Sequence, residues 1–305
     1  LIGLNGSGEA MTIASLFLKR GGNYVCILND QEEAGYFYHD LMQLTGSNEI
    51  YFFPSAYRRA IKYGHIDPAN EILRTEVLSV LQDPEAPFVI VSYPDALAEK
   101  VISRDDLKKN TLKISVGEKL DNMFVSDVLD EYGFEQVDYV YEPGQYALRG
   151  SILDVFSFSY EFPYRIDFFG KEVETIRTFD VETQLSKEKL ESIYIVPEMN
   201  KSDRTNTLLL DSLPAQTILA ARDLAWTKER IGSLWNEEPV VGDEESFADI
   251  SRMRARLVTG EDFLRAALNF RRIHFGTRPA GVADATLTFS TQAQPIYHKN
   301  FDMVS

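Results

Sequence analysis

The chain has 305 residues, 44% of them hydrophobic and 26% charged, a composition typical of globular proteins, and its length suits two or three domains. The formal net charge is −16, and an acidic surface repels phosphate, which argues against non-specific nucleic-acid binding by the whole chain. No apolar run reaches the roughly 20 residues that span a bilayer, no signal peptide is evident, and the single cysteine, Cys26, cannot form an internal disulfide, so we expect a cytoplasmic protein.

Residues 1–110 alternate between strand and helix patterns. Strands are expected at residues 1–4, 24–28, 50–53 and 88–92. Helices are expected at residues 10–20, 31–44 and 68–81, the last of them opened by Asp67 as N-cap and Pro68 at the first helical position. This alternation predicts a parallel sheet with right-handed crossovers, and therefore the first part of an α/β domain.

Residues 111–197 change to a pattern in which strands dominate. One amphipathic helix is expected at residues 125–132. Strands are expected at residues 137–141, 151–158, 163–169, 173–179 and 192–196. Gly170-Lys171, between two of these strands, is typical of a hairpin turn. Together these patterns predict a smaller α+β domain.

Residues 198–305 return to a mixed pattern. Short strands are expected at residues 207–210, 217–220 and 285–289, and helices at residues 223–234 and 262–270. A segment of this size can complete the first α/β domain and end in a C-terminal linker. The expected fold class is therefore α/β. A P-loop-like, helicase-type parallel-sheet domain is formed by segments 1–110 and 198–305, with the smaller α+β domain of residues 111–197 inserted between them.

A glycine-rich segment near the start of the chain has the spacing of a phosphate-binding P-loop, Gly-x-x-x-x-Gly, between a strand and a helix. In a working P-loop, the next two residues are a lysine that neutralises phosphates and a serine or threonine that holds Mg²⁺. Here Glu9 takes the lysine position and Ala10 the hydroxyl position. We therefore expect a degenerate P-loop that binds neither ATP nor Mg²⁺. Its residues are Gly3, Gly6, Gly8, Glu9 and Ala10.

Three interpretations of this segment compete. An active NTPase is the least favoured, because both chemical groups are lost. A tight turn without a ligand needs only the glycines. The third interpretation is an inherited P-loop scaffold reused to bind another protein, and like the second it implies no ATP turnover. No catalytic residue, cofactor or metal ion is expected in this chain, and the four histidines are too far apart in sequence to indicate a zinc site.

The strand expected at residues 163–169 has two distinct faces. Tyr164, Ile166 and Phe168 form one face and suit a core, while Arg165, Asp167 and Phe169 form the other. An arginine and an aromatic residue on an outward face have the composition of a binding hot spot. The alternative is a surface ion pair between Arg165 and Asp167, with Phe169 half buried under the hairpin. The pattern alone leaves both interpretations open.

Two long motifs carry a resemblance to a known family. Residues 142–156 read Glu-Pro-Gly-Gln-Tyr-Ala-Leu-Arg-Gly-Ser-Ile-Leu-Asp-Val-Phe, and residues 165–180 begin Arg-Ile-Asp-Phe-Phe-Gly. With them, the chain closely resembles the N-terminal part of the bacterial transcription-repair-coupling factors (Mfd), which is similar to UvrB of nucleotide excision repair. The resemblance covers most of residues 1–200 and is weak from about residue 200 to 305.

The resemblance implies a module that recruits UvrA through the inserted domain. The family's UvrA-contacting positions fall on Arg149, Arg165 and Phe169 in this sequence. It also implies that contacts with RNA polymerase and double-stranded DNA belong to domains of the full-length protein that are absent here, as do its ATP- and Mg²⁺-dependent motor domains. Two alternatives stay open: a nucleotide-binding, UvrB-like DNA-processing enzyme, and an autoinhibitory module in which intramolecular contacts mask the Arg165 face.

Two further segments bear on DNA binding. Residues 53–64 correspond to the aromatic hairpin with which UvrB probes damaged DNA. This segment is short and not rich in tyrosine, so we do not expect it to probe damage. The arginines between Arg252 and Arg272 are the candidate basic patch of this acidic chain. A solvated helical face paired with acids such as Glu261 and Asp262 is the favoured interpretation of that cluster.

Overall fold

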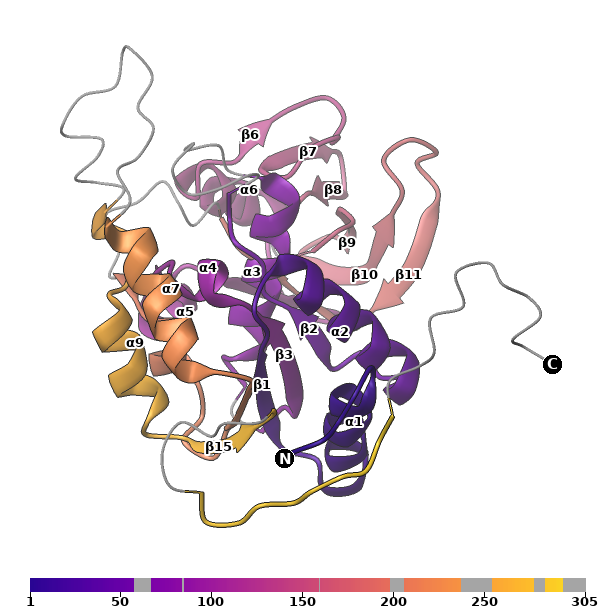
Figure 1. The fold of residues 1–305 in the computed structure, drawn as a ribbon. Coiled ribbons are helices and arrows are strands. Elements are labelled where there is room, and N and C mark those ends of the chain that lie inside the picture. Colours follow the sequence, from indigo (N-terminus) through magenta and orange to yellow (C-terminus); the bar gives the residue numbers. More distant parts are fainter. Residues whose placement is uncertain are drawn as a thin grey trace, which may run out of the picture.

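The computed structural model describes residues 1–57, 67–83, 85–158, 160–197, 206–236, 254–276 and 283–292. Within them, a five-stranded sheet in the order β15-β14-β1-β3-β2 forms the centre of the larger domain (Figure 1). Its strands are β1 (Asn23–Ile27), β2 (Ile50–Phe52), β3 (Phe88–Ser92), β14 (Ile218–Ala221) and β15 (Arg271–His274). Every pairing in this sheet is parallel. Because β14 lies between β1 and β15, two distant chain segments build one sheet, which confirms the predicted α/β fold class.

Helices cover this sheet, with α1 and α2 packed together at one side of the domain and α7 and α9 at the other (Figure 1). Strands β1 and β3 are buried along their whole length, as parallel strands covered on both faces are. The predicted N-cap Asp67 is confirmed, since its carboxylate accepts a hydrogen bond from the Ala69 N–H at 3.0 Å. The helices are α1 (Gly8–Arg20), α2 (Gln31–Thr45), α3 (Pro68–Val80), α4 (Pro94–Leu97), α5 (Arg104–Lys109), α7 (Leu224–Asn236) and α9 (Gly260–Ala267).

The inserted domain is a six-stranded sheet in the order β11-β10-β9-β8-β7-β6, with helix α6 (Asn122–Glu131) packed on one face. Neighbouring strands are antiparallel except for β6 and β7. The predicted hairpin turn at Gly170-Lys171 joins β9 to β10, and Gly170 has a φ of 64°, which favours glycine. The strands are β6 (Glu135–Gln136), β7 (Gln145–Arg149), β8 (Ile152–Val155), β9 (Tyr164–Phe169), β10 (Glu172–Phe179) and β11 (Ser186–Leu190).

The two chain ends of the inserted domain lie side by side. Strand β5 (Leu112–Ser115) pairs antiparallel with β12 (Ser192–Ile195), so the chain enters and leaves the domain at one place. Next to them, β4 (Val101–Ile102) pairs with β13 (Asn206–Thr207). Adjacent ends are the geometry that lets one domain be inserted in another. The exact boundaries, 110/111 and 197/198, stay predictions.

Several expected strands are wrong. Residues 1–4 form no strand of the sheet, because only Ile2 makes an isolated bridge, to Thr288. The same bridge is all that forms of the strand expected at residues 285–289. Residues 137–141 are not a strand, since β6 ends at Gln136, and residues 207–210 pass from β13 into a 3₁₀ helix, Leu209–Ser212. Val137 and Val140 belong instead to a small cluster with Phe156 and Ala147, so their hydrophobicity reflects packing of a loop.

The structure also contains strands that the sequence did not indicate, namely β4, β5, β6, β7, β11 and β15. Most of the hairpin-like stretch at residues 53–64 lies outside the described residues, as does Arg252. No helix within the described ranges is long and apolar enough to cross a membrane.

Candidate functional site

The outward face of β9 carries an exposed aromatic ring next to a fixed arginine. Tyr164, Ile166 and Phe168 are buried, so the predicted core face is confirmed. On the opposite face, Phe169 is 78% exposed, and the Arg165 side chain is 14% exposed. Phe169 is therefore not half buried under the hairpin, as one of the two sequence interpretations required.

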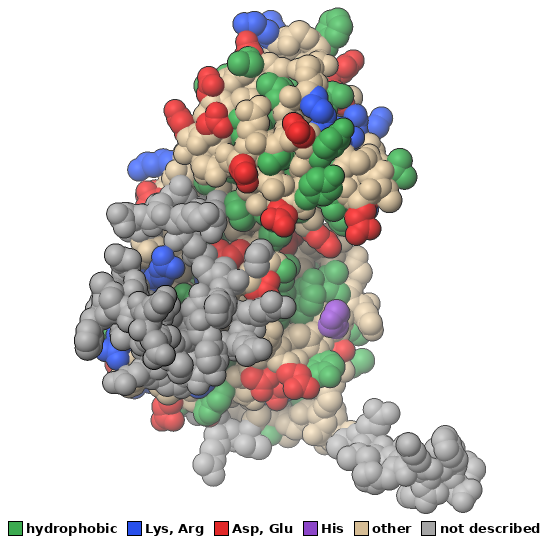
Figure 2. Space-filling model, turned by 90° about the horizontal axis from the view of Figure 1, so that it is seen from above, with side chains coloured by type: hydrophobic (Ala, Val, Ile, Leu, Met, Phe, Trp, Pro, Cys, Tyr) green, Lys and Arg blue, Asp and Glu red, His purple; other side chains and the backbone are tan. Residues whose placement is uncertain are grey.

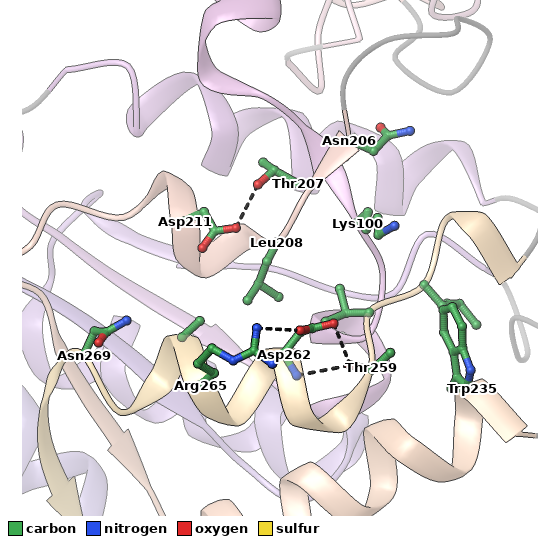
Figure 3. A pocket seen from close by; sticks show the side chains of 13 residues that line it. Lys100, Asn206, Thr207, Leu208, Asp211, Trp235, Thr259, Asp262, Arg265 and Asn269 are labelled. Atoms are coloured by element: carbon green, nitrogen blue, oxygen red, sulfur yellow. Dashed lines mark hydrogen bonds and ion pairs between the residues drawn. The ribbon is translucent and has the colours of Figure 1, made fainter.

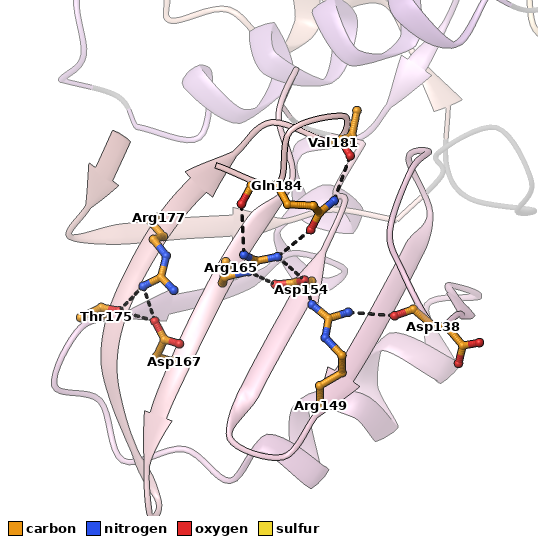
Figure 4. A network of polar contacts seen from close by, with 9 residues as sticks. All are labelled: Asp138, Arg149, Asp154, Arg165, Asp167, Thr175, Arg177, Val181 and Gln184. Carbon is orange, nitrogen blue, oxygen red and sulfur yellow. Dashed lines mark hydrogen bonds and ion pairs between the residues drawn. The ribbon is translucent and has the colours of Figure 1, made fainter. Parts of the chain in front are cut away.

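Arg165 is held by a carboxylate from the neighbouring strand, not by Asp167. In the β8–β9 ladder, Asp154 lies directly opposite Arg165. The Arg165 Nε and Nη2 atoms donate to the two carboxylate oxygens of Asp154 at 2.7 and 2.8 Å, a bidentate pair (Figure 4). Asp154 is 1% exposed. Its hydrogen bonds raise the pKa of the Arg165 guanidinium above the ordinary value.

A loop closes over the other side of the same guanidinium. The Gln184 side-chain oxygen accepts a hydrogen bond from Arg165 Nη2 at 3.0 Å, and the guanidinium carbon lies 4.2 Å from the centre of the Phe179 ring. Gln184 has a φ of 59°, uncommon for a residue other than glycine. Its side-chain amide donates to the Val181 carbonyl oxygen at 2.9 Å. These contacts fix both the position and the orientation of Arg165.

Arg149, at the end of β7, contacts the same carboxylate. Its Nη2 pairs with Asp154, and its Nη1 donates to the Asp138 carbonyl oxygen at 2.8 Å (Figure 4). The guanidinium also lies 5.2 Å from the centre of the Tyr139 ring, and the side chain is 36% exposed. Asp154 therefore brings together two of the three residues that the sequence indicated, while the third, Phe169, lies further along β9.

The glycine-rich turn at the start of the chain is contacted by side chains and backbone of the protein itself. Glu9, in the first turn of α1, is buried and accepts a hydrogen bond from Arg222 Nε at 2.9 Å. Arg222 Nη1 donates to Glu33 Oε2, also at 2.9 Å. Ala10 is buried in the core. The residue at the lysine position of the motif is thus an acid already paired with an arginine.

A second chain segment lies along the backbone of this turn. The Ile2 N–H donates to the Leu287 carbonyl oxygen at 2.9 Å, and the Asn5 N–H donates to the Thr291 hydroxyl at 3.0 Å. A Cβ on Gly3 would lie 2.1 Å from the Phe289 carbonyl oxygen, and Gly3 has a φ of 81°. Glycine is required here by the close approach of residues 283–292 as well as by the turn itself.

Comparison with known proteins identifies the inserted domain. Residues 112–200 match the family described as "UvrB interaction domain". These residues form a UvrB interaction domain. The match covers every strand of the six-stranded sheet and therefore the whole Arg149–Asp154–Arg165 network.

The chain is also homologous to the N-terminal region of transcription-repair-coupling factors. It is 29% identical to the factor of Escherichia coli K12 over 195 residues, which are 64% of this chain and 17% of that protein. It is 28% identical to the factor of Bacillus subtilis 168 over 198 residues, 65% of this chain and 17% of that protein. For the Myxococcus xanthus factor, the identity is 28% over 231 residues, 73% and 19% of the two chains. The chain thus spans less than a fifth of the length of these curated relatives.

Three polar residues of the UvrB interaction domain were not identified from the sequence, and the sequence pattern carries a signal for only some of them. Asp154 interrupts an apolar strand pattern, so a carboxylate on the outward face was a detectable signal. Gln184 lies in a turn and carries no such signal. Arg177 of β10 pairs with Asp167, the residue that the sequence had offered as a partner for Arg165.

The arginine cluster near the C-terminus is partly paired with acids, as expected. Arg265 lies 3.1 Å from Asp262, one turn earlier in α9, while Glu261 pairs instead with Lys228 at 2.6 Å. Arg272 donates to the Leu268 carbonyl oxygen at 3.0 Å.

A pocket of about 430 Å³ lies where α9 approaches β13 (Figure 3). Several polar groups in its wall already satisfy one another. The Thr207 hydroxyl donates to Asp211 at 2.9 Å, and the Thr259 hydroxyl donates to Asp262 at 2.7 Å. Asp262 also forms an ion pair with Arg265. We assign this pocket no function.

Proposed function

We propose that the chain is the UvrA-recruiting module of a transcription-repair-coupling factor and acts in transcription-coupled nucleotide excision repair. One observation carries the proposal: Phe169, 78% exposed, lies on the same strand face as an arginine that a buried aspartate holds in place. A fixed arginine next to an exposed aromatic ring has the composition of an interface hot spot.

The charge of this face favours an acidic partner group. Arg149 and Arg165 share the carboxylate of Asp154, so their network has a surplus positive charge on a chain whose net charge is −16. Figure 2 shows acidic and basic side chains interspersed on the face that it displays. The positive charge of the two guanidinium groups suits a carboxylate of UvrA, with Phe169 as the apolar anchor.

Replacing Phe169 by alanine tests the anchor. We expect Phe169→Ala to weaken UvrA binding by about 2 kcal/mol, roughly thirtyfold in Kd, because a hot-spot ring loses its partner surface. Titration calorimetry of the chain with purified UvrA measures this. Phe124→Ala is the matched control, since Phe124 is 52% exposed but lies on α6, across the sheet. Equal affinities for both variants would remove the support for Phe169 as anchor.

We also propose that this module does not turn over ATP. Arg222 supports this, because it occupies the carboxylate of Glu9 where a P-loop would present a lysine to phosphate. Ala10 has no hydroxyl for Mg²⁺, and residues 283–292 use donors of the turn backbone. Contacts with RNA polymerase and double-stranded DNA through further domains, and masking of the Arg165 face by intramolecular contacts, stay predictions.

Nucleotide binding has a direct measurement. Titration of the chain with a fluorescent ATP analogue and Mg²⁺ is expected to give no saturable change in anisotropy. Glu9→Lys/Arg222→Ala serves as a comparison, since it removes the ion pair and restores the lysine. Saturation by the wild-type chain at micromolar analogue would favour a nucleotide-binding, UvrB-like enzyme instead.

A further inference from the structure

Arg177 of β10 has guanidinium donors that no group in the described part of the chain uses. Its Nη1 contacts Asp167 and lies 3.2 Å from the Thr175 hydroxyl (Figure 4). Its Nε is buried without a hydrogen-bond partner, and within the described ranges its hydrogen bonds all use Nη1. The side chain is 25% exposed. A buried donor without an acceptor is unfavourable, and a ligand that supplies an acceptor relieves this.

The position of Arg177 places it on the same face as Arg165. In the β9–β10 ladder the two arginines lie directly opposite each other, and in the β10–β11 ladder Arg177 lies opposite Lys189. One row across four strands therefore reads Asp154, Arg165, Arg177, Lys189. Like charges directly opposite in a sheet destabilise it, so three adjacent cations need a compensating negative charge.

The charges on this face do not balance. Three arginines, Arg149, Arg165 and Arg177, contact two carboxylates, Asp154 and Asp167. Arg165 already uses its Nε–Nη2 edge on Asp154 and Gln184, so on this residue only Nη1, which lies 3.5 Å from the Gln184 carbonyl oxygen, is left without a close acceptor in the described part of the chain. On Arg177 the Nε of the equivalent edge has no hydrogen-bond partner, and among the described residues the hydrogen bonds of this guanidinium all involve Nη1. That edge is the one that binds a carboxylate in a bidentate manner.

We propose that Arg177, with the exposed Lys189 beside it, is a further part of the UvrA-binding face and takes a carboxylate of the partner. The inference rests on the proposed function and extends it from Arg149, Arg165 and Phe169 across β10 to β11. The partner surface is accordingly acidic over the width of several strands, and not at one residue alone.

The test is the affinity of purified UvrA for the chain and its variants, measured at several salt concentrations. We expect Arg177→Gln to weaken binding about tenfold, because a charged hydrogen-bond pair is lost. Arg177→Lys keeps the charge but not the fork, so a smaller loss is expected. Lys189→Gln is expected to change affinity least and to flatten the salt dependence, as an exposed rim charge does.

Lys113→Gln is the matched control. It removes one exposed positive charge from β5, outside the six-stranded sheet, and is expected to bind UvrA like the wild type. Urea unfolding of each variant separates binding from folding. If Arg177→Gln is destabilised, the affinities of Arg177→Lys and Lys189→Gln test the inference in its place. Wild-type affinity and wild-type salt dependence in both of these variants would overturn the inference.

The same experiment separates this inference from the proposed function. Loss of binding in Arg165→Ala with wild-type affinity in Arg177→Gln overturns the inference alone. Wild-type affinity in Arg165→Ala and Phe169→Ala overturns the proposed function, and the inference with it.

Discussion

Arg165→Ala is expected to weaken UvrA binding by about 2–5 kcal/mol, at least thirtyfold in Kd, as truncation of a buried charge pair at an interface does. The Arg165 side chain is 14% exposed and is fixed by Asp154, Gln184 and the Phe179 ring, so it meets a partner with little loss of side-chain freedom. Its removal takes away the fixed positive charge that the partner carboxylate faces and leaves Asp154 with fewer donors. Calorimetric titration with UvrA gives the affinity, and circular dichroism confirms that the variant is folded.

Arg165→Lys tests whether the geometry of the guanidinium matters in addition to its charge. Lysine keeps the positive charge but cannot form two parallel hydrogen bonds with Asp154, so we expect most of the affinity to be lost even though the net charge is unchanged. Recovery of wild-type affinity in Arg165→Lys would show that charge alone matters and that the fixed geometry does not. Wild-type affinity in Arg165→Ala would contradict the assignment of this face.

Asp154→Ala is expected to lower the free energy of unfolding by about 3 kcal/mol, the lower end of the cost of breaking a buried ion pair. The substitution leaves Arg149 and Arg165 without their shared carboxylate. The cost stays at the lower end because the Arg149 side chain is 36% exposed and regains water. Urea unfolding followed by circular dichroism measures the change.

The matched control for Asp154→Ala is Lys171→Ala. Lys171 is 82% exposed and pairs with Asp121 at 3.0 Å, so its loss is expected to change the free energy of unfolding by less than about 1 kcal/mol. Both tryptophans lie in α7, and their fluorescence therefore reports the unfolding of the larger domain separately. Equal stability of Asp154→Ala and Lys171→Ala would show that the buried carboxylate does not hold the arginines.

Sequence periodicity was sufficient to predict the faces of β9, because alternation depends only on the strand itself. It predicted that Arg165 and Phe169 lie on the same face of the strand, and the structure confirms this. It could not give the partner of Arg165. That partner, Asp154, depends on the register of the β8–β9 ladder, which couples residues that alternation in one strand does not relate.

The strands missed from sequence show the same limit. Strand β11 reads Ser-Lys-Glu-Lys-Leu and has no apolar alternation, because it lies at the edge of the sheet and is mostly exposed. Gly3 was correctly expected to need glycine at a turn. The close approach of Phe289, from almost the other end of the chain, is a tertiary contact that no local pattern indicates.

The central claim, that the outward face of β9 recruits UvrA, is tested most directly by titrating purified UvrA with the wild-type chain and with the doubly substituted Arg165→Ala/Phe169→Ala chain. The account predicts saturable binding by the wild-type chain and none by the double variant, with both chains giving the same circular dichroism spectrum. Superimposable binding curves for the two chains would contradict it.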